Sequence, residues 1–150
     1  MSQPVRILVA TRNVGKIREI ASVLAPVGAV LVGIGDVAGR GPAPDILEDA
    51  SSFSGNAALK AMAMSAWSGM AALGEDSGLE VDALDGWPGV FSARYAGPGA
   101  DDAANNAKVV AEVLRFPDRP RTARFRCAAA VAVGGRVLGR AEGAVEGEIV

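Results

Sequence analysis

Strand-like and helix-like hydrophobic patterns alternate along the first third of the chain. Residues 5–10 form a short apolar run rich in β-branched side chains, which is typical of a buried strand. Asn13 is placed to cap a helix that begins at Val14 and that Pro26 ends, with one apolar face made of Ile17, Ile20, Ala21 and Leu24. Residues 27–34 predict a second strand. Because a helix connects the two strands, we expect them to be parallel.

The middle of the chain predicts a long loop, a helix and two short strands. Residues 35–52 are rich in Gly, Pro and Asp, and long loops of this kind are usually functional or disordered. Strong helix formers at 56–68 are followed by Gly69, a typical stop signal. Residues 70–75 and 79–84 then indicate two buried strands, before a turn at Asp85-Gly86.

The last third predicts one more helix and a β-hairpin. Asp101 or Asp102 can cap a helix that runs to about Arg115 and buries Ala103, Ala107, Val110 and Leu114. Residues 121–133 and 136–141 flank Gly134-Gly135, a strong hairpin signal because a type I′ turn needs two positive φ angles. The pattern predicts an α/β fold with a mixed central sheet and flanking helices, and we expect residues 1–150 to form a single domain.

Composition narrows the cellular setting. A chain of 150 residues can bury roughly 70% of its unfolded surface, and the scarcity of aromatic residues predicts a core of Ala, Val, Leu and Ile. A net charge of −2 gives no general attraction to nucleic acid or membranes, so neither is expected as a partner. The single Cys127 excludes an intramolecular disulfide. With no apolar run of ~20 residues and no signal-peptide layout, we expect a cytoplasmic protein.

The chain contains no histidine, and this narrows its chemistry further. A Ser-His-Asp triad, a Cys-His pair and a His-ligated zinc site are all excluded. Acid–base or metal chemistry must therefore use Asp, Glu, Lys or Tyr. Carboxylates without imidazole or clustered thiols favour a hard cation such as Mg²⁺ or Mn²⁺.

The junction Thr11-Arg12-Asn13-Val14-Gly15-Lys16 is a candidate phosphate site. Lys16 falls in the first turn of the predicted helix, where the helix dipole disfavours a cation. A bound polyphosphate would explain this placement, because helix N-terminal N–H groups and the lysine would converge on the anion while Gly15 allows close approach. The segment is not a Walker-type phosphate loop, so a plain strand–turn–helix junction with an exposed lysine stays an equal alternative.

An acidic segment follows the second predicted helix. Glu75 and Asp76 end an apolar run before Ser77-Gly78, which would place two carboxylates at a strand end, where open α/β sheets bind ligands. Adjacent strand residues point to opposite faces, so both need not bind one ion. A metal here would neutralise phosphate charge while a carboxylate accepts a proton from water. An ordinary turn is the alternative.

Taken in order, these motifs resemble the inosine/xanthosine triphosphate pyrophosphatase family. The resemblance runs from about Val5 to the last residue. It rests on T-R-N-V-G-K at 11–16, F-S-G-N-A-A-L-K-A at 53–61, E-D-S-G-L-E-V-D-A-L at 75–84, S-A-R-Y-A-G at 92–97, D-D-A-A-N-N-A-K at 101–108 and A-E-G at 141–143. The block at 75–97 is the most specific part.

The resemblance implies an activity and a set of site residues. Members of that family use Mg²⁺ to convert a nucleoside triphosphate and water to the monophosphate and pyrophosphate, and usually work as homodimers. The substrates implied are the deaminated purine nucleotides ITP, dITP and XTP. By position, the triphosphate would be held by Thr11, Arg12, Asn13, Val14, Gly15 and Lys16, with Lys60 and Ser77. Asp76 would be the proton acceptor and a metal ligand, with Glu48 and Glu75 completing the metal site.

Two departures from the family pattern keep other hypotheses open. Gly55 replaces the glutamate of the family's F-x-E-N-A motif, which suggests weaker metal binding or a different number of ions. The family continues into Gly-Tyr-Asp-Pro and Ser-His-Arg segments that grip the purine base, and neither is present here. A nucleotide-binding or dimerising remnant without catalysis is therefore the main alternative, and a Maf-like pyrophosphatase acting on pyrimidine triphosphates is a weaker one.

Overall fold

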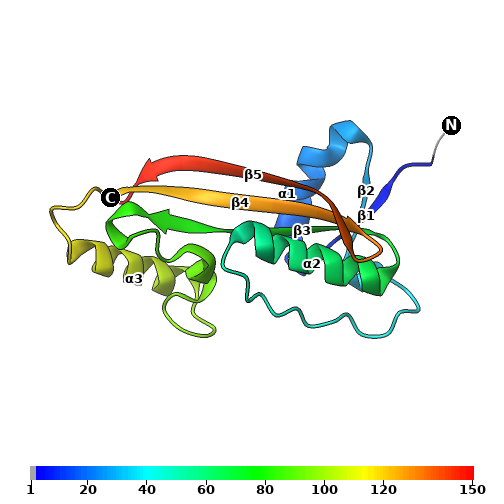
Figure 1. The fold of residues 1–150 in the computed structure, drawn as a ribbon, viewed down its shortest axis with the longest axis horizontal. Helices are drawn as coiled ribbons and strands as arrows, with labels where there is room; N and C mark the ends of the chain where they lie inside the picture. Colours follow the sequence, from blue (N-terminus) through cyan, green and yellow to red (C-terminus); the bar gives the residue numbers. More distant parts are fainter. Residues whose placement is uncertain (1–2) are drawn as a thin grey trace.

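The computed structural model describes residues 3–150 and arranges them around one five-stranded sheet of order β2-β1-β3-β4-β5 (Figure 1). The strands are β1 (Arg6–Val9), β2 (Val30–Val32), β3 (Ala71–Val81), β4 (Thr122–Val133) and β5 (Arg136–Glu148). β1 pairs in parallel with both β2 and β3, whereas β4 is antiparallel to β3 and to β5. The predicted mixed α/β sheet and the parallel first strand pair are confirmed.

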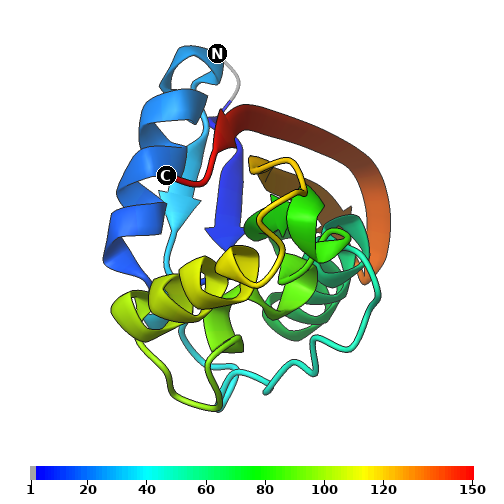
Figure 2. The same cartoon turned by 90° about the vertical axis from the view of Figure 1, so that its left-hand side faces the viewer.

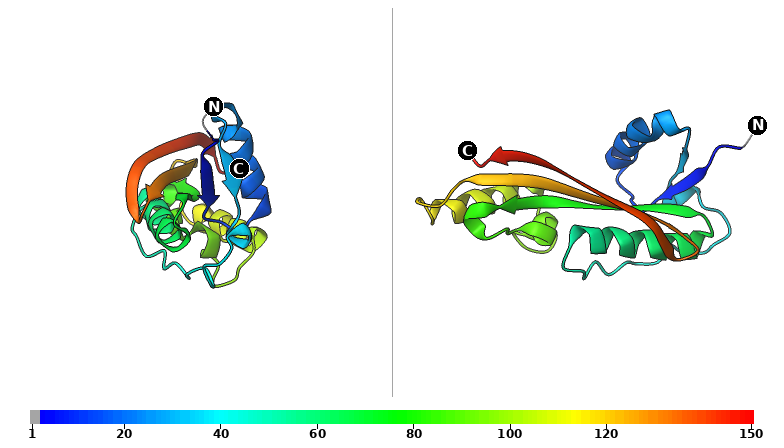
Figure 3. Two further views of the ribbon diagram at one scale, coloured as in Figure 1. Left: turned by 90° about the vertical axis from the view of Figure 1, so that its right-hand side faces the viewer. Right: turned by 45° about the horizontal axis from the view of Figure 1, so that its top comes forward.

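Three helices flank this sheet: α1 (Val14–Leu24), α2 (Phe53–Ser68) and α3 (Asp102–Leu114). α2 and α3 follow one side of the long strands and α1 lies on the other side, as Figure 1 and Figure 3 both show. Seen end-on in Figure 2, the long strands curl around α2. Short 3₁₀ turns occupy Ala25–Val27, Ile34–Asp36, Asp82–Leu84 and Gly89–Arg94. In the described part of the chain, no helix is both long and apolar enough to cross a membrane.

The acidic segment lies in the middle of a strand, which corrects the sequence prediction of two strands at 70–75 and 79–84. β3 runs without a break and pairs with β4 from Ala72 to Val81. Ser77-Gly78 is therefore no turn. Gly78 is needed for another reason: a Cβ there would lie 2.6 Å from Ser92 Oγ and 2.7 Å from the Gly89 carbonyl. The loop after β3 packs directly on the strand at this point.

Several element boundaries also differ from the predicted ones. α2 begins at Phe53 rather than at 56, because Ser52 Oγ accepts a hydrogen bond from the Gly55 amide and caps the helix. β2 is limited to Val30–Val32, and β5 continues to Glu148, seven residues past the predicted end. The Gly134-Gly135 hairpin is confirmed, with φ of 58° and 78° at the two glycines.

α3 buries a different face from the predicted one. Ala103, Ala107, Val110 and Leu114 are exposed, whereas Asn105, Val109 and Val113 are buried. The polar Asn105 turns inward because its amide binds the backbone of the preceding loop, at Ala93 and Ala96. α3 is therefore rotated about its axis relative to the prediction, and it buries a different face from the one that its apolar residues alone would select.

Small residues bring α2 into close contact with the sheet. Ala57, Ala58 and Ala61 pack with Phe53 against Ala128, Ala130 and Ala132 of β4. Gly74 of β3 is essential to this approach, because a Cβ there would lie only 2.1 Å from the Ala57 carbonyl oxygen. This contact fixes the height of α2 over β3, and with it the polar side chains that α2 presents to the acidic segment.

Candidate phosphate and metal site

The site forms where β1 stops and β3 continues. The last hydrogen bond between these strands runs from the Ala10 amide to the Leu73 carbonyl, at 2.9 Å. The carbonyl of Glu75 lies two residues further along the same edge of β3, where β1 has no partner to offer. Lys60 of α2 fills that position, with its Nζ 3.0 Å from the Glu75 carbonyl oxygen. The open edge of β3 thus lies beside the carboxyl end of a parallel strand.

The segment from Thr11 to Lys16 forms a tight, capped junction between β1 and α1. Thr11 Oγ1 accepts a hydrogen bond from the Asn13 amide at 3.1 Å, and Asn13 Oδ1 accepts from the Lys16 amide at 3.2 Å, which confirms Asn13 as the cap. Arg12, Asn13, Val14 and Gly15 are all exposed to solvent. An anion could therefore approach this helix N-terminus from outside.

On the α1 side of β3, Lys16 pairs with Glu75. Lys16 Nζ lies 2.6 Å from Glu75 Oε2 and 3.4 Å from Ser77 Oγ. Burial would raise the pKa of Glu75, but the hydrogen bond and charge of Lys16, together with hydrogen bonds from Ser77 and Cys127, keep that pKa below its usual range. Cys127 of β4 lies beside the pair, and burial together with the Glu75 charge raises the pKa of its thiol to about 11.

On the α2 side of β3, a second lysine and two other carboxylates gather. Lys60 Nζ lies 2.6 Å from Glu48 Oε1, and Asp76 Oδ2 accepts a hydrogen bond from Asn56 Nδ2 at 3.1 Å. Burial and the nearby Glu48 charge raise the pKa of Asp76, against the opposing effects of Asn56 and Lys60. The pKa of Asp76 is therefore raised mainly because burial outweighs the stabilising effects of Asn56 and Lys60.

The structure brings the sequence-predicted residues into one region but divides them between two faces. Lys16, Glu75 and Ser77 share one face, and Glu48, Lys60 and Asp76 share the other. Lys60 connects the two, because it contacts the Glu75 backbone while its charge acts on Asp76. A small cavity of about 30 Å³ at the end of β1 is lined by both lysines, Glu75 and Thr11.

One residue of the site, Asn56, is not among those to which the sequence assigned a role. It is 2% exposed and connects Asp76 to the loop before α2, since its Oδ1 accepts from the Ala50 amide at 3.0 Å. The signal that could have revealed it is an amide side chain directly before the small apolar residues Ala57 and Ala58, because a buried polar group must find partners.

The donor set fits a hard divalent ion that the substrate helps to hold. Among residues 3–150 no three His, Cys, Asp or Glu side chains are arranged around a common point, so no complete protein cage exists there. Glu48 and Asp76 supply two carboxylates near each other, and Mg²⁺ is commonly bound by one or two carboxylates plus substrate phosphates and water. The raised pKa of Asp76 indicates a group that a nearby cation would stabilise.

Gly55, which replaces the family's glutamate, packs against the loop that carries Glu48. A Cβ at this position would lie 2.7 Å from the Ala50 Cβ and 3.1 Å from Ser52 Oγ. A glutamate here would therefore displace the loop as placed. The close contact between the loop and α2 is therefore possible because residue 55 has no side chain.

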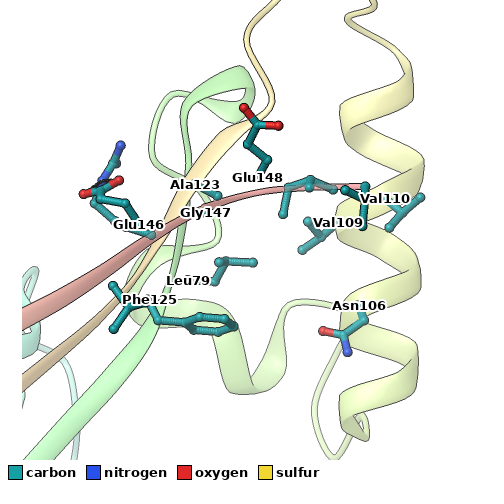
Figure 4. Close-up of a pocket in the computed structure, with 13 residues that line it drawn as sticks. Leu79, Asn106, Val109, Val110, Ala123, Phe125, Glu146, Gly147 and Glu148 are labelled. Atoms are coloured by element: carbon teal, nitrogen blue, oxygen red, sulfur yellow. Dashed lines mark hydrogen bonds and ion pairs between the residues drawn. The ribbon is translucent and has the colours of Figure 1, made fainter.

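Two larger cavities are lined mainly by apolar side chains. One of about 410 Å³ lies between α3 and the ends of β4 and β5, lined by apolar side chains such as Leu79, Val109 and Phe125 (Figure 4). Its acidic neighbour Glu146 is already paired with Arg124 at 3.0 Å. The other, of about 590 Å³, lies on the α1 side and is apolar except at the Lys16 end. Of these three cavities, only the small one at the end of β1 is lined by both Lys16 and Lys60.

The loop after β3 exposes an aromatic pair beyond the site. Trp87 stacks on Phe91 with ring centroids 5.3 Å apart, and the two are 52% and 41% exposed. They are therefore not part of the buried core. Ser92 anchors the loop by accepting a hydrogen bond from the Leu79 amide of β3 at 2.9 Å.

This fold and charge arrangement is typical of α/β proteins that bind phosphorylated ligands beside the carboxyl end of a parallel strand. The chain belongs to the Ham1 family, whose model matches residues 7–150. It is 46% identical over 145 residues to a dITP/XTP pyrophosphatase of Desulforamulus reducens, covering 97% of this chain and 71% of that protein. It is also 48% identical over 126 residues to a dITP/XTP pyrophosphatase of Geobacter sulfurreducens, covering 84% of this chain and 62% of that one.

Solved structures agree with this assignment. A HAM1 protein from Coxiella burnetii superimposes with a TM-score of 0.86 at 34% identity, over 97% of this chain and 73% of that one. A nucleoside-triphosphatase, or dITP/XTP pyrophosphatase, from Mycobacterium abscessus gives a TM-score of 0.75 at 39% identity, over 97% and 74%. The chain thus spans between about six and seven tenths of the length of the relatives that it matches.

Proposed function

We propose that this chain is a Mg²⁺-dependent pyrophosphatase that converts deaminated purine nucleoside triphosphates, namely ITP, dITP and XTP, to the monophosphate and pyrophosphate. The observation that supports the proposal is the link that Lys60 makes across β3. Lys60 contacts the carbonyl of Glu75, whose side chain pairs with Lys16, and it also pairs with Glu48 while its charge acts on Asp76. Curated relatives at 46% and 48% identity are named dITP/XTP pyrophosphatases, which supports this substrate class.

In this proposal the triphosphate lies against the exposed junction at 11–16. Backbone N–H groups at the start of α1 and the ammonium groups of Lys16 and Lys60 bind its oxygens, and Ser77 adds a hydroxyl contact. For Lys16 to reach a phosphate it exchanges part of its interaction with Glu75. Glu75 therefore keeps the Lys16 side chain oriented toward the site before the substrate binds.

Glu48 and Asp76 are the proposed metal ligands, and Glu75 is a third candidate that would have to exchange Lys16 for the ion. When bound, Mg²⁺ would neutralise charge on the phosphate oxygens, and Mn²⁺ has the same preference for oxygen ligands. The protein groups supply the remaining chemistry. Asn56 occupies Oδ2 of Asp76, so the other carboxylate oxygen is the proposed acceptor of a proton from the water that attacks the α-phosphorus.

A homodimer and a cytoplasmic role in cleansing the nucleotide pool complete the proposal. The exposed Trp87–Phe91 stack supports a contact surface in the loop beside the site, because large exposed aromatic groups are enriched at interfaces.

The experiment that tests the function compares the products formed from ITP, XTP, ATP and a pyrimidine triphosphate with Mg²⁺ present. The proposal expects pyrophosphate and the monophosphate in equal amounts, with ITP and XTP cleaved faster than ATP. Pyrophosphate released at equal rates from all nucleotides would mean a working phosphate site without base selection. Tight triphosphate binding without product would contradict catalysis and support the remnant hypothesis.

A further inference from the structure

The side chain of Asn56 makes hydrogen bonds to Asp76 and to the loop that carries Glu48. It is buried, with 2% exposure, and lies in the first turns of α2. Its Oδ1 accepts a hydrogen bond from the Ala50 amide at 3.0 Å, and its Nδ2 donates to Asp76 Oδ2 at 3.1 Å. Ala50 is two residues after Glu48, in an irregular segment with no strand partner. The loop that carries one carboxylate is therefore linked through an amide to the other.

Asn105 of α3 is a close structural parallel to Asn56. Comparing the two shows which hydrogen bond anchors a loop in both helices and which one only Asn56 makes. Asn105 is also the fourth residue of its helix and is also buried, at 6% exposure. Its Oδ1 accepts from the Ala96 amide in the preceding loop at 2.8 Å, as Asn56 accepts from Ala50. Its Nδ2, however, donates to the Ala93 carbonyl at 3.0 Å. Anchoring a loop needs no carboxylate, so the bond from Asn56 to Asp76 is the added feature.

The packing of Ala50 on Gly55 is an independent sign that the loop position matters. The two residues touch so closely that a Cβ at Gly55 would lie 2.7 Å from the Ala50 Cβ. With the loop in this place, Glu48 reaches Lys60 at 2.6 Å. The absence of a side chain at Gly55 therefore leaves room for the loop, and the hydrogen bond from Ala50 to the Asn56 amide holds it in place.

We propose that Asn56 is a positioning residue for hydrolysis: it orients Asp76 and, through the Ala50 amide, sets the distance of Glu48 from it. The inference rests on the proposed function, because it assigns Glu48 and Asp76 to one reaction. It assigns Asn56 no contact with substrate. Its effect is exerted on the carboxylates alone, which predicts a loss in kcat with little change in KM for the nucleotide bound at residues 11–16.

Asn56→Asp separates positioning from loop anchoring. The new carboxylate still accepts from the Ala50 amide but replaces the donor to Asp76 with a negative charge. We expect kcat for ITP to fall by about 10-fold or more, as for a displaced catalytic group, with KM changed by less than about 3-fold. Amide exchange at Ala50 should stay slow. The matched control Asn105→Ala should loosen the Ala96 amide and leave kcat unchanged.

Gly55→Ala tests the same idea without altering Asn56. Alanine favours the helix, so folding is retained, but its Cβ pushes Ala50 away. We expect faster exchange of the Ala50 amide and a higher Mg²⁺ concentration for half-maximal rate, both reversed by adding Ala50→Gly.

The outcomes separate the inference from the function on which it rests. Wild-type kcat in Asn56→Asp, or unchanged Ala50 exchange in Gly55→Ala, would overturn the positioning role while the wild-type enzyme remains active. Absence of pyrophosphate release by the wild-type chain would overturn the proposed function itself. In that case unaltered Ala50 exchange in Gly55→Ala would refute the loop link as well.

Discussion

Glu75 and Asp76 are neighbours on β3 and yet lie in opposite electrostatic settings. Glu75 faces α1 and pairs with Lys16, and its pKa is lowered even though burial opposes this. Asp76 faces α2 and receives one neutral amide from Asn56, while burial and Glu48 raise its pKa. The alternation of a strand delivers the two carboxylates to two surroundings. Glu75 already has a lysine partner at hydrogen-bond distance, whereas the pKa of Asp76 is raised mainly by burial, which suits a group that must bind a cation or a proton.

The largest expected effect comes from removing the charge of Asp76. Asp76→Asn should lower turnover of ITP by about 10³-fold or more, because it removes both the proton acceptor and a metal ligand. The melting temperature should stay equal or rise, since the folded protein no longer buries a charge whose pKa is raised. Steady-state rates and thermal unfolding check both parts. Turnover near the wild-type value would show that Asp76 is not the reacting carboxylate.

The next largest effect breaks the packing that places α2 over both carboxylates. Gly74→Ala puts a Cβ 2.1 Å from the Ala57 carbonyl, and overpacking of this kind costs about 1–3 kcal/mol. Gly139→Ala in β5 is the matched control, because nothing lies within 4 Å of the added Cβ. Urea unfolding of both variants measures the difference. Equal stability of the two would mean that α2 does not rest on Gly74 as described.

A smaller effect is expected from Glu75→Gln. Loss of the ion pair should lower the melting temperature, the opposite sign to Asp76→Asn, and reduce kcat/KM by about 10-fold as Lys16 loses its orientation. Because folding lowers the pKa of Glu75, the pair stabilises the protein above the ordinary carboxyl pKa. This contribution disappears as the pH falls through the lower folded pKa. The wild-type loss of stability in acid should therefore be shallower in Glu75→Gln.

The Mg²⁺ dependence of Glu75→Gln shows whether Glu75 belongs only with Lys16 or also with the metal ligands on the other face of β3. If Glu75 only orients Lys16, the Mg²⁺ concentration for half-maximal rate stays at the wild-type value. A marked increase would place Glu75 among the metal ligands with Glu48 and Asp76. Titration of activity with MgCl₂ at fixed ITP distinguishes the two roles.

The smallest effect uses Cys127 as a reporter of the Glu75 charge. With a thiol pKa of about 11, Cys127 should react slowly with an alkylating agent at pH 8, and roughly tenfold faster per pH unit until the thiolate forms. Glu75→Gln removes one cause of the raised pKa and should speed the reaction several-fold at pH 8. Equal rates in the two proteins would argue against a charged Glu75 beside the thiol.

The local pattern of the chain was enough to predict the first βαβ unit and the hairpin. Asn13 as a cap, the parallel strands around α1, and the Gly134-Gly135 turn all depend on residues close in sequence. β3 was divided wrongly because Ser77-Gly78 has the composition of a turn. What keeps it extended is the pairing with β4, about fifty residues away, which no local pattern contains.

The candidate site shows the same limit. Lys16, Lys60 and Glu75 line the cavity at the end of β1, but the motif Glu75-Asp76 gave no sign of which carboxylate contacts Lys16 and which is close to Glu48. That distinction depends on which face α1 and α2 cover. Asn56 was passed over for a similar reason, since its importance follows from three-dimensional partners at Ala50 and Asp76. The apolar pattern of α3 failed where Asn105 overrode it.

Isotope labelling tests the central claim most directly, namely that water is activated beside Asp76 to attack the α-phosphorus of a deaminated purine triphosphate. ITP is hydrolysed by the chain with Mg²⁺ in water enriched in ¹⁸O, and the products are analysed by mass spectrometry. The account predicts one ¹⁸O atom in IMP and none in pyrophosphate, with labelled product lost in Asp76→Asn. Label in pyrophosphate, or release of orthophosphate and IDP, would contradict it.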